Sequence, residues 1–158
     1  MIMDIFYQEI NDANIAKMAI DNAYGEFLKA RIAGKKEIDG IGFDSSREQY
    51  NASALLLELT KLKNLFLWIV NEDLYVEGMN FVFGCALPYR GAVLSTYRLD
   101  SDELVKKEVI HEVGHVLGLQ HCRNYCVMRF SNSVRDAKQK PSYLCESCKS
   151  KLNELWKK

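Results

Sequence analysis

The sequence lacks the features that mark several classes of protein. Only two of its 158 residues are proline, and it contains no repeat or low-complexity stretch, which argues against a collagen-like or disordered chain. Basic and acidic residues number 21 each, so the charge excess typical of a nucleic-acid-binding protein is absent. The longest apolar run, residues 65–70, is too short to cross a bilayer. With 48% hydrophobic residues, the chain is expected to form one globular domain that binds neither nucleic acid nor membrane.

The N-terminus also lacks the marks of a secretion signal. Residues 1–10 have no basic n-region, and polar residues interrupt their apolar character after a few positions. We therefore expect a cytoplasmic protein, and we expect it to be a monomer. In that reducing compartment a Cys-x-x-Cys pair favours metal binding or catalysis over a structural disulfide.

Histidine and cysteine are scarce in most of the chain and concentrated in one part of it. All three histidines lie between positions 111 and 121, and four of the five cysteines lie between positions 122 and 148. The fifth, Cys85, falls in an apolar segment and is interpreted as a small buried residue. The functional site is therefore expected between residues 111 and 148.

Hydrophobic periodicity and turn residues predict an α+β chain. The expected strands cover residues 2–10, 34–43, 65–70, 80–87 and 92–99. The expected helices cover residues 13–30, 46–64 and 102–117, with a closing helix after Pro141 and irregular chain before it. Ser46 and Gln49 have the spacing of a capping box for the second helix, and Gly118 is suited to end the third with a positive φ.

The histidine spacing predicts one metal site. His111 and His115 lie one helical turn apart, so both imidazoles can reach one ion. His121 would point away if the helix continued, so the chain must reverse, and Gly118 permits that reversal. Zinc suits three imidazoles, and a three-histidine set leaves a fourth position for water, as catalytic zinc sites do.

Glu112 follows the first expected ligand directly. Zinc lowers the pKa of a bound water toward about 7, and we expect Glu112 to accept its proton as general base and to pass it to the leaving amine. The pattern predicts a zinc metallopeptidase that hydrolyses peptide bonds through a zinc-activated water, with a peptide or protein as substrate.

The cysteines predict a second, closed zinc site. Cys122 and Cys126 are separated by three residues and Cys145 and Cys148 by two, a spacing close to that of zinc ribbons. We therefore expect two zinc ions per chain, one catalytic and one structural. The single domain, residues 1–158, would then comprise a sheet and active-site helix in 1–121 and a four-cysteine zinc subregion with the closing helix in 122–158. A redox role for Cys145 and Cys148 is the alternative, although no thioredoxin-type strand precedes them.

Residues 111–121, H-E-V-G-H-V-L-G-L-Q-H, resemble the zinc-binding signature of the metzincin clan of metallopeptidases. With the C-x-M and C-x-x-C that follow, the pattern resembles the archaemetzincins specifically. The resemblance implies a zincin-like domain with a twisted mixed β-sheet, an active-site helix and a C-terminal helix. It also implies an intracellular peptidase, with aminopeptidase action as one form of that activity. Cys122 stands where many secreted metzincins have Asp, and Phe130 stands where some have a tyrosine ligand.

The resemblance assigns two further elements. It implies that Met128 lies in a turn beneath the metal. It also implies that an edge strand above the active-site helix binds substrate, for which residues 81–86 are the candidate, with Phe81, Gly84 and Ala86 as contact residues. Main-chain pairing would hold an extended peptide, and Gly84 would allow a close backbone approach.

Two other classes of function remain open on the sequence. The chain could be a non-catalytic or degenerate zinc-binding protein that acts as an interaction module, or a zinc ribbon that binds nucleic acid. Glu112 favours catalysis, because a purely structural site needs no base beside its ligand. The balanced charge disfavours nucleic-acid binding.

Overall fold

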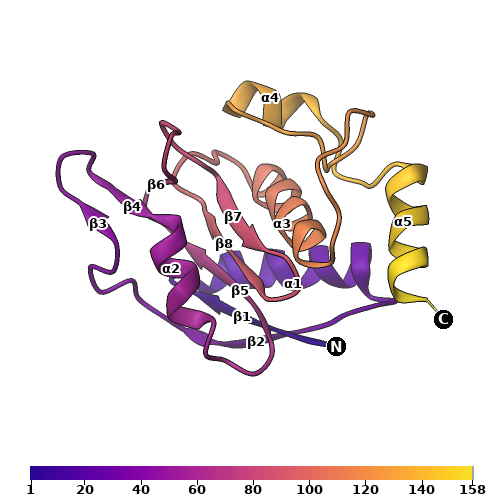
Figure 1. The fold of residues 1–158 in the computed structure, drawn as a ribbon, viewed down its shortest axis with the longest axis horizontal. Helices are drawn as coiled ribbons and strands as arrows, with labels where there is room; N and C mark the ends of the chain where they lie inside the picture. The colour runs from indigo at the N-terminus through magenta and orange to yellow at the C-terminus, as the bar shows by residue number, and fades with distance from the viewer. Residues whose placement is uncertain (158) are drawn as a thin grey trace.

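The computed structural model describes residues 1–157. Its strands are β1 (Ile2–Tyr7), β2 (Lys29–Lys35), β3 (Phe43–Asp44), β4 (Gln49–Asn51), β5 (Leu65–Val70), β6 (Leu74–Tyr75), β7 (Gly84–Leu87) and β8 (Gly91–Ser95). Its helices are α1 (Ile10–Tyr24), α2 (Ala52–Leu59), α3 (Asp102–Val116), α4 (Val134–Gln139) and α5 (Glu146–Trp156). Figure 1 shows α4 and α5 outside the sheet, on the side of α3.

The main sheet has five strands in the order β2-β1-β5-β8-β7. The neighbours β2, β1, β5 and β8 run parallel, whereas β7 pairs antiparallel with β8 through a hairpin. The sheet is therefore mixed, and β2 and β7 are its two edges. A smaller sheet, β3-β4-β6, adjoins it.

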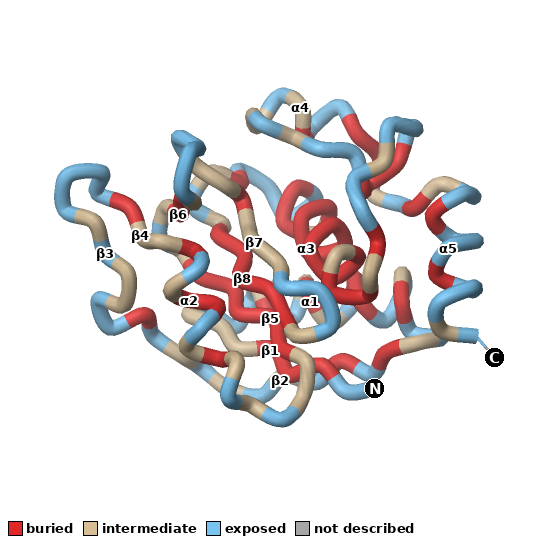
Figure 2. Tube along the Cα trace, in the orientation of Figure 1, coloured by how far each residue is buried: buried red, intermediate tan, exposed pale blue. Residues whose placement is uncertain are grey.

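Helices cover both faces of the main sheet. In β5, Leu67 and Ile69 pack into the core formed with α1 and α3, while Phe66, Trp68 and Val70 pack into the core formed with α2. This alternation explains why the whole of β5 is apolar, as predicted for a strand buried on both faces. Figure 2 shows that burial is concentrated in the central strands and in α3, whereas the β3–β4 hairpin and α5 carry much exposed chain.

The first half of the chain departs from the predicted boundaries. The first strand ends at Tyr7 rather than at residue 10, and α1 ends at Tyr24 rather than at residue 30. Residues 29–35 form β2, which pairs with β1, so the predicted strand at 34–43 was placed too late. The helix predicted over 46–64 is the shorter α2, because 49–51 form β4 and Asn51, rather than Ser46, caps the helix through its side chain.

In the second half the strands predicted at 80–87 and 92–99 are shorter, as β7 and β8, so Phe81 precedes the edge strand rather than lying in it. The helix α3, in contrast, follows the sequence pattern closely. The α3 helix ends at Val116, one residue before the predicted end, and Gly118 has a φ of +103°. Two carbonyls at the C-terminal end of α3 accept hydrogen bonds from outside the helix. The Tyr89 amide donates to the Val116 carbonyl at 2.8 Å, and Trp156 Nε1 donates to the Leu117 carbonyl at 2.8 Å. These bonds fix the end of α3 against the β7–β8 turn and α5. The helix α4 lies in the segment predicted to be irregular.

Within residues 1–157 no helix combines the length and the apolarity that a membrane crossing requires.

Candidate active site

The reversal at Gly118 gathers the three histidines. The rings of His111 and His115 have centroids 4.7 Å apart, and the ring of His121 lies 5.4 Å from the first and 4.7 Å from the second. One ring nitrogen from each lies within 4.8 Å of the other two. The structure therefore brings together all three residues that the sequence predicted as one site.

Backbone carbonyls orient two of the rings. His111 Nδ1 lies 2.9 Å from the Val127 carbonyl oxygen, and His115 Nδ1 lies 2.8 Å from that of Leu119. Both rings must donate through Nδ1–H, so each Nε2 presents a lone pair, and the two Nε2 atoms are 3.2 Å apart. A tetrahedral zinc ion with bonds of about 2.1 Å holds two nitrogens about 3.4 Å apart, which these atoms match. The donor set fits zinc.

Burial favours the neutral form of the ligand-type imidazoles. It lowers the pKa of His111 well below its ordinary value, with Lys140 as the second cause. Burial is also the largest cause that lowers the pKa of His115 and of His121. Neutral imidazole is the form that binds a metal.

Glu112 is buried beneath the edge strand β7. A Cβ atom built on Gly84 would lie 2.6 Å from Glu112 Oε2 and 2.7 Å from the Val93 carbonyl oxygen, so only glycine allows this approach. Burial raises the pKa of Glu112 to about 8, with the charge of Glu108 as the second cause. Glu112, the base expected from the sequence, thus lies against β7, which contains the second half of the segment expected to bind substrate.

Met128 is fully buried and packs against the helix that carries two of the histidines. A Cβ on Gly114 would lie 2.5 Å from Met128 Sδ and 2.8 Å from Tyr24 Oη. Met128 therefore contacts α3 directly at a glycine midway between Glu112 and Val116. Its carbonyl accepts a 3.0 Å hydrogen bond from the Cys122 amide, which joins this turn to the cysteine cluster.

Two charged residues beside the histidine cluster, Lys140 and Glu108, were not predicted from the sequence. Lys140 Nζ lies 3.0 Å from Glu108 Oε2 and 3.3 Å from His111 Nδ1, and it donates to the Arg129 carbonyl at 3.2 Å. Glu108 lies one helical turn before Glu112 on the same face of α3, a spacing that was available as a signal. Lys140 carries no such signal, because only the path of the chain after α4 brings it to α3.

A cleft of about 320 Å³ opens over these residues. The strand β7 and the preceding chain form one wall, including Phe81, Gly84 and Ala86. On the α3 side the cleft is lined by Glu108, His111, Glu112 and His115. The chain after α3 contributes His121, Phe130, Ser131 and Asn132. The ring of Phe130 packs edge-on against His121 at 5.2 Å, so this residue, in the position where some metzincins have a tyrosine ligand, supports the third histidine instead.

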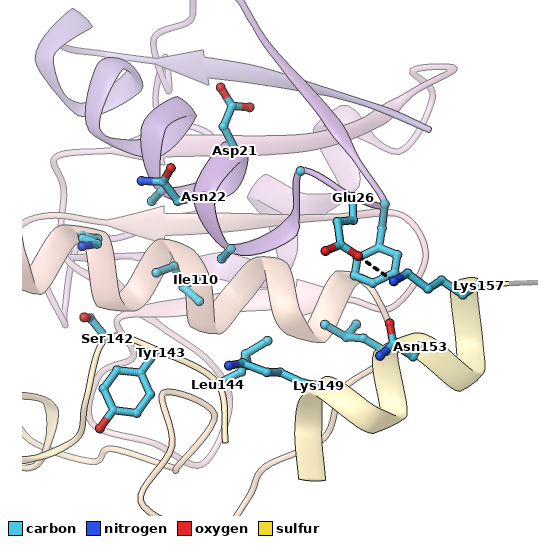
Figure 3. A pocket seen from close by; sticks show the side chains of 16 residues that line it. Asp21, Asn22, Glu26, Ile110, Ser142, Tyr143, Leu144, Lys149, Asn153 and Lys157 are labelled. Atoms are coloured by element: carbon cyan, nitrogen blue, oxygen red, sulfur yellow. Dashed lines mark ion pairs between the residues drawn. The ribbon is translucent and has the colours of Figure 1, made fainter. Parts of the chain in front are cut away.

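A second cavity, larger than this cleft, lies elsewhere. It measures about 870 Å³ and is walled by the C-terminal half of α1 on one side and by α5 with the chain before it on the other (Figure 3). Ile110 of α3 contributes to its lining, and the Glu26–Lys157 ion pair, 2.9 Å, closes one end. None of the three histidines lines it, so its size does not make it the reaction site.

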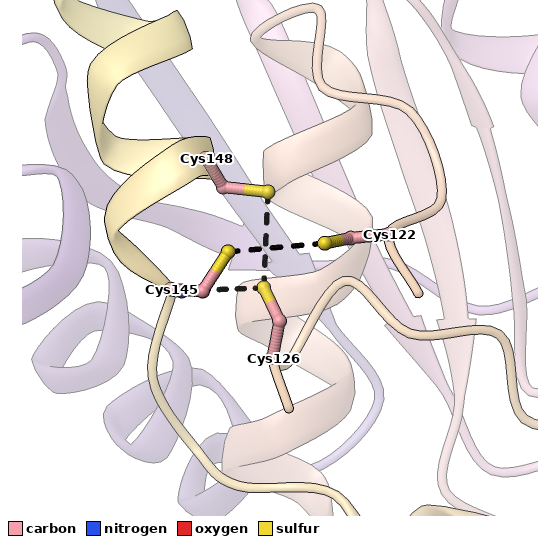
Figure 4. A group of neighbouring side chains, drawn as sticks. All are labelled: Cys122, Cys126, Cys145 and Cys148. Carbon is pink, nitrogen blue, oxygen red and sulfur yellow. Dashed lines mark hydrogen bonds between the residues drawn. The ribbon is translucent and has the colours of Figure 1, made fainter. Parts of the chain in front are cut away.

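Four cysteines form a second cluster beside the histidines. Figure 4 shows Cys122 and Cys126 from the loop after α3 facing Cys145 and Cys148 at the start of α5. The Cys122–Cys145 and Cys126–Cys148 sulfur atoms are each separated by 3.8 Å, and all four cysteines are free of disulfides. Tetrahedral zinc with bonds of about 2.3 Å separates its sulfur ligands by about 3.8 Å, so this geometry fits a closed site with four thiolate ligands.

The fifth cysteine lies outside both clusters and is half-buried, whereas the sequence predicted a buried residue. Burial, with the charge of Glu112 as second cause, raises the pKa of Cys85 to about 11, so its thiol stays protonated at neutral pH. In the cysteine cluster, burial alone would raise the pKa of Cys145, but a hydrogen bond from Asn124 and its neighbours outweigh burial and lower that pKa to about 6. A thiolate is thus available in the cluster, as a zinc ligand requires.

The sequence model of peptidase family M54 matches residues 30–154, most of the chain and all seven of the clustered histidines and cysteines. The chain belongs to peptidase family M54. Among its curated relatives, the archaemetzincin of Nanoarchaeum equitans is 45% identical over 138 residues, covering 86% of this chain and 79% of the relative. The archaemetzincin of Archaeoglobus fulgidus is 50% identical over 117 residues, covering 70% and 72% of the two chains.

Crystal structures of two archaemetzincins share the fold. The archaemetzincin of Archaeoglobus fulgidus, complexed with malonate, has a TM-score of 0.86 at 35% identity and covers 96% of this chain and 99% of its own. That of Methanopyrus kandleri has a TM-score of 0.88 at 31% identity and covers 98% and 94%. The predicted zincin-like α+β fold and the resemblance to archaemetzincins are confirmed. The chain is a zinc-dependent metallopeptidase rather than a non-catalytic zinc-binding module.

Proposed function

We propose that this chain cleaves extended peptides laid along β7, with His111, His115 and His121 holding one catalytic zinc and Glu112 acting as general base. The observation that carries the proposal is the contact between Glu112 and Gly84, because a backbone paired with β7 would pass directly beside the buried carboxylate. Phe81 and Ala86 flank Gly84 in the same wall of the cleft and would contact the peptide.

Each residue has one task in this function. A bound zinc ion supplies Lewis acidity, which lowers the pKa of water and polarises a carbonyl. With zinc bound nearby, its positive charge would favour the ionised form of Glu112, which would then accept the proton of the attacking water and return it to the departing amine. The Val127 and Leu119 carbonyls hold His111 and His115 in the tautomer that leaves Nε2 free. Met128 supports α3 from below.

The test combines zinc quantification with digestion of a peptide library. Glu112→Gln removes the base without changing the size of the side chain, and we expect it to retain zinc and to lose hydrolysis by about a thousandfold. Glu103→Gln is the matched control, because Glu103 lies on the same helix but is exposed in its first turn, and it should cleave as the wild type does. A Glu112→Gln protein that cleaves at the wild-type rate would contradict the proposal.

Aminopeptidase action is the specific form of the activity that we propose. Pairs of peptides that differ only in an N-terminal acetyl group test it. An aminopeptidase removes the first residue of the free peptide and leaves its acetylated twin intact. Internal cleavage of both peptides at equal rates would identify an endopeptidase instead.

The second zinc is also a proposal. Cys122, Cys126, Cys145 and Cys148 would hold it, giving two ions per chain, and their 3.8 Å sulfur separations support this assignment. Its role would be structural, because it would join the loop after α3 to the start of α5. The division of one domain into residues 1–121 and a four-cysteine subregion, 122–158, follows from it; residue 158 itself lies outside the described chain.

The remaining expectations about the whole protein stay predictions. They are a cytoplasmic location, a monomeric state, and the lack of nucleic-acid and membrane partners.

A further inference from the structure

The wall of the cleft that faces α3 includes a segment without regular structure. Residues 76–83, here called the wall segment, connect β6 to β7 and contribute Val76, Met79, Phe81, Val82 and Phe83 to the cleft lining. Its backbone hydrogen bonds are few: the Val82 amide donates to the Leu74 carbonyl at 2.9 Å, the Ser95 amide donates to the Phe83 carbonyl at 2.7 Å, and the Met79 amide donates to the Val76 carbonyl at 3.1 Å. A segment of this kind needs side-chain support to keep one position.

Two side chains from the β3–β4 region supply part of that support. Arg47 Nη2 donates to the Met79 carbonyl at 2.7 Å and to the Asn80 carbonyl at 3.3 Å. Gln49 Nε2 donates to the same Asn80 carbonyl at 2.8 Å. These bonds hold the middle of the wall segment, and neither donor residue lines the cleft.

Asp73 links this support to a second arginine. Its carboxylate accepts from Gln49 at 3.0 Å and receives a two-point contact from Arg98, at 2.9 Å from Nε and 2.8 Å from Nη2. The Arg98 guanidinium stacks on the Phe81 ring with its carbon 4.0 Å from the ring centre. Residues far apart in the sequence thus converge on one short segment.

We propose that Arg47, Gln49 and Arg98, joined through Asp73, are positioning residues that fix the wall segment for peptide binding. The inference rests on the proposed function, because Phe81 lies in the wall along which the peptide would run. If the wall segment is already ordered before binding, peptide binding does not include the free-energy cost of ordering that segment. Loss of the support should therefore weaken peptide binding.

The support should not affect the chemical step. None of its four residues lines the cleft, and their hydrogen-bond partners include none of the histidines, the cysteines or Glu112. An interaction made equally in the bound substrate and in the transition state changes KM and leaves kcat unchanged. Zinc content should also stay unchanged.

The experiment compares Arg98→Ala with Arg31→Ala. Arg31 is a matched control, because it pairs with Asp4 near the other edge of the sheet and the two aspartate side chains are similarly exposed, 11% for Asp73 and 12% for Asp4. The substrate is the library peptide that the wild type cleaves best, made with a free N-terminus and with a fluorophore and a quencher on side chains that flank the cleaved bond. We expect Arg98→Ala to raise KM about tenfold with kcat within about twofold, and Arg31→Ala to change neither.

Hydrogen exchange gives a readout that does not require activity. In Arg98→Ala, amides of residues 76–83, including that of Val82, should exchange faster, while those of α3 should not, with or without zinc. Arg98→Lys should restore only part of the effect, because lysine cannot make the planar two-point contact. If Arg98→Ala does not fold, Arg47→Ala replaces it in the experiment, because Arg47 is exposed. Arg47→Ala should show the same rise in KM.

The outcomes separate this inference from the proposed function. If the wild type cleaves and the Arg98 and Arg47 variants keep its KM and its exchange rates, the positioning role is wrong. A fall in kcat with unchanged KM would also overturn it. If the wild type cleaves no library peptide, the proposed function fails, and faster exchange confined to residues 76–83 would still support the mechanical part of the inference.

Discussion

Lys140 Nζ lies 3.0 Å from Glu108 Oε2, and both side chains are almost completely buried, with exposures of 1% and 3%. The pair joins the chain after α4 to the turn of α3 that precedes His111. Because both side chains are buried, water cannot solvate either charge if its partner is removed. The two residues therefore form an obligatory pair directly behind the histidine cluster.

Breaking this pair should be costly. Lys140→Met leaves Glu108 buried without its counter-charge, and we expect the free energy of unfolding to fall by about 3 kcal/mol, measured by denaturant titration. Adding Glu108→Gln to that variant should recover part of the loss. The exposed pair Lys149–Glu146 is the control, and Lys149→Met should change stability little. A Lys140→Met protein as stable as the wild type would contradict this account.

Gly84 should be needed for catalysis rather than for folding alone. Its Cβ in Gly84→Ala would enter the space of Glu112 Oε2, so the carboxylate must move, and we expect kcat to fall about tenfold or more with zinc retained. Gly34→Ala is the control, because Gly34 is also a strand glycine but has nothing within 4 Å of a built Cβ. Steady-state kinetics on the same peptide probe compare them. Equal activity in the two variants would rule out this contact as a determinant.

Gly118 should be irreplaceable for two separable reasons. Its φ of +103° strains any other residue, and a Cβ there would lie 2.7 Å from Tyr89 Oη. Gly40 has a φ of +77° and open space, so Gly40→Ala carries only the conformational strain, about 1 kcal/mol. We expect Gly118→Ala to lower the melting temperature further than Gly40→Ala and to be the variant that loses zinc, because His121 depends on the reversal. Retention of full zinc content would argue against this role.

Removal of one cysteine should distinguish two zinc ions from one. Cys126→Ser should bind one zinc per chain, and Cys85→Ser, its control outside the cluster, should bind two, as measured by elemental analysis. A chelator should expose residues 122–157 to hydrogen exchange before it unfolds the sheet, because the proposed zinc would join the cysteine loop to α5. A Cys126→Ser protein that holds as much zinc as Cys85→Ser would show that the cysteines bind none.

The site was easier to predict than the boundaries of the first helices and strands. Short spacings within 111–148 specify which side chains can share an ion, and every histidine and cysteine so chosen lies in one of the two clusters. The end of α1 was missed because Ala30 continues a helical spacing although residues 29–35 pair with β1. Pairing with a distant strand outweighs local propensity, and the local pattern does not contain that information.

The support around the site shows the same limit. Glu108 could have been found from its spacing to Glu112, since four residues place two side chains on one helix face. Lys140 and Arg47 act through contacts with residues 32 or 33 positions away, and Arg98 through the ring of another segment, so no local pattern marks them. Their partners are set by the topology of the whole chain.

The two edges of the main sheet differ in a way that bears on what they accept. At β2, Lys29, Arg31 and Lys35 are exposed, and such charges on an edge discourage pairing with strands of other molecules. The other edge, β7, has the sequence Gly-Cys-Ala-Leu and carries no charged side chain. Charge thus protects one edge against pairing with other molecules, while the other edge lines the cleft, where a strand that paired with it, as proposed for the substrate, would meet Glu112. A chain attracted to the unprotected edge would be cleaved rather than accumulated.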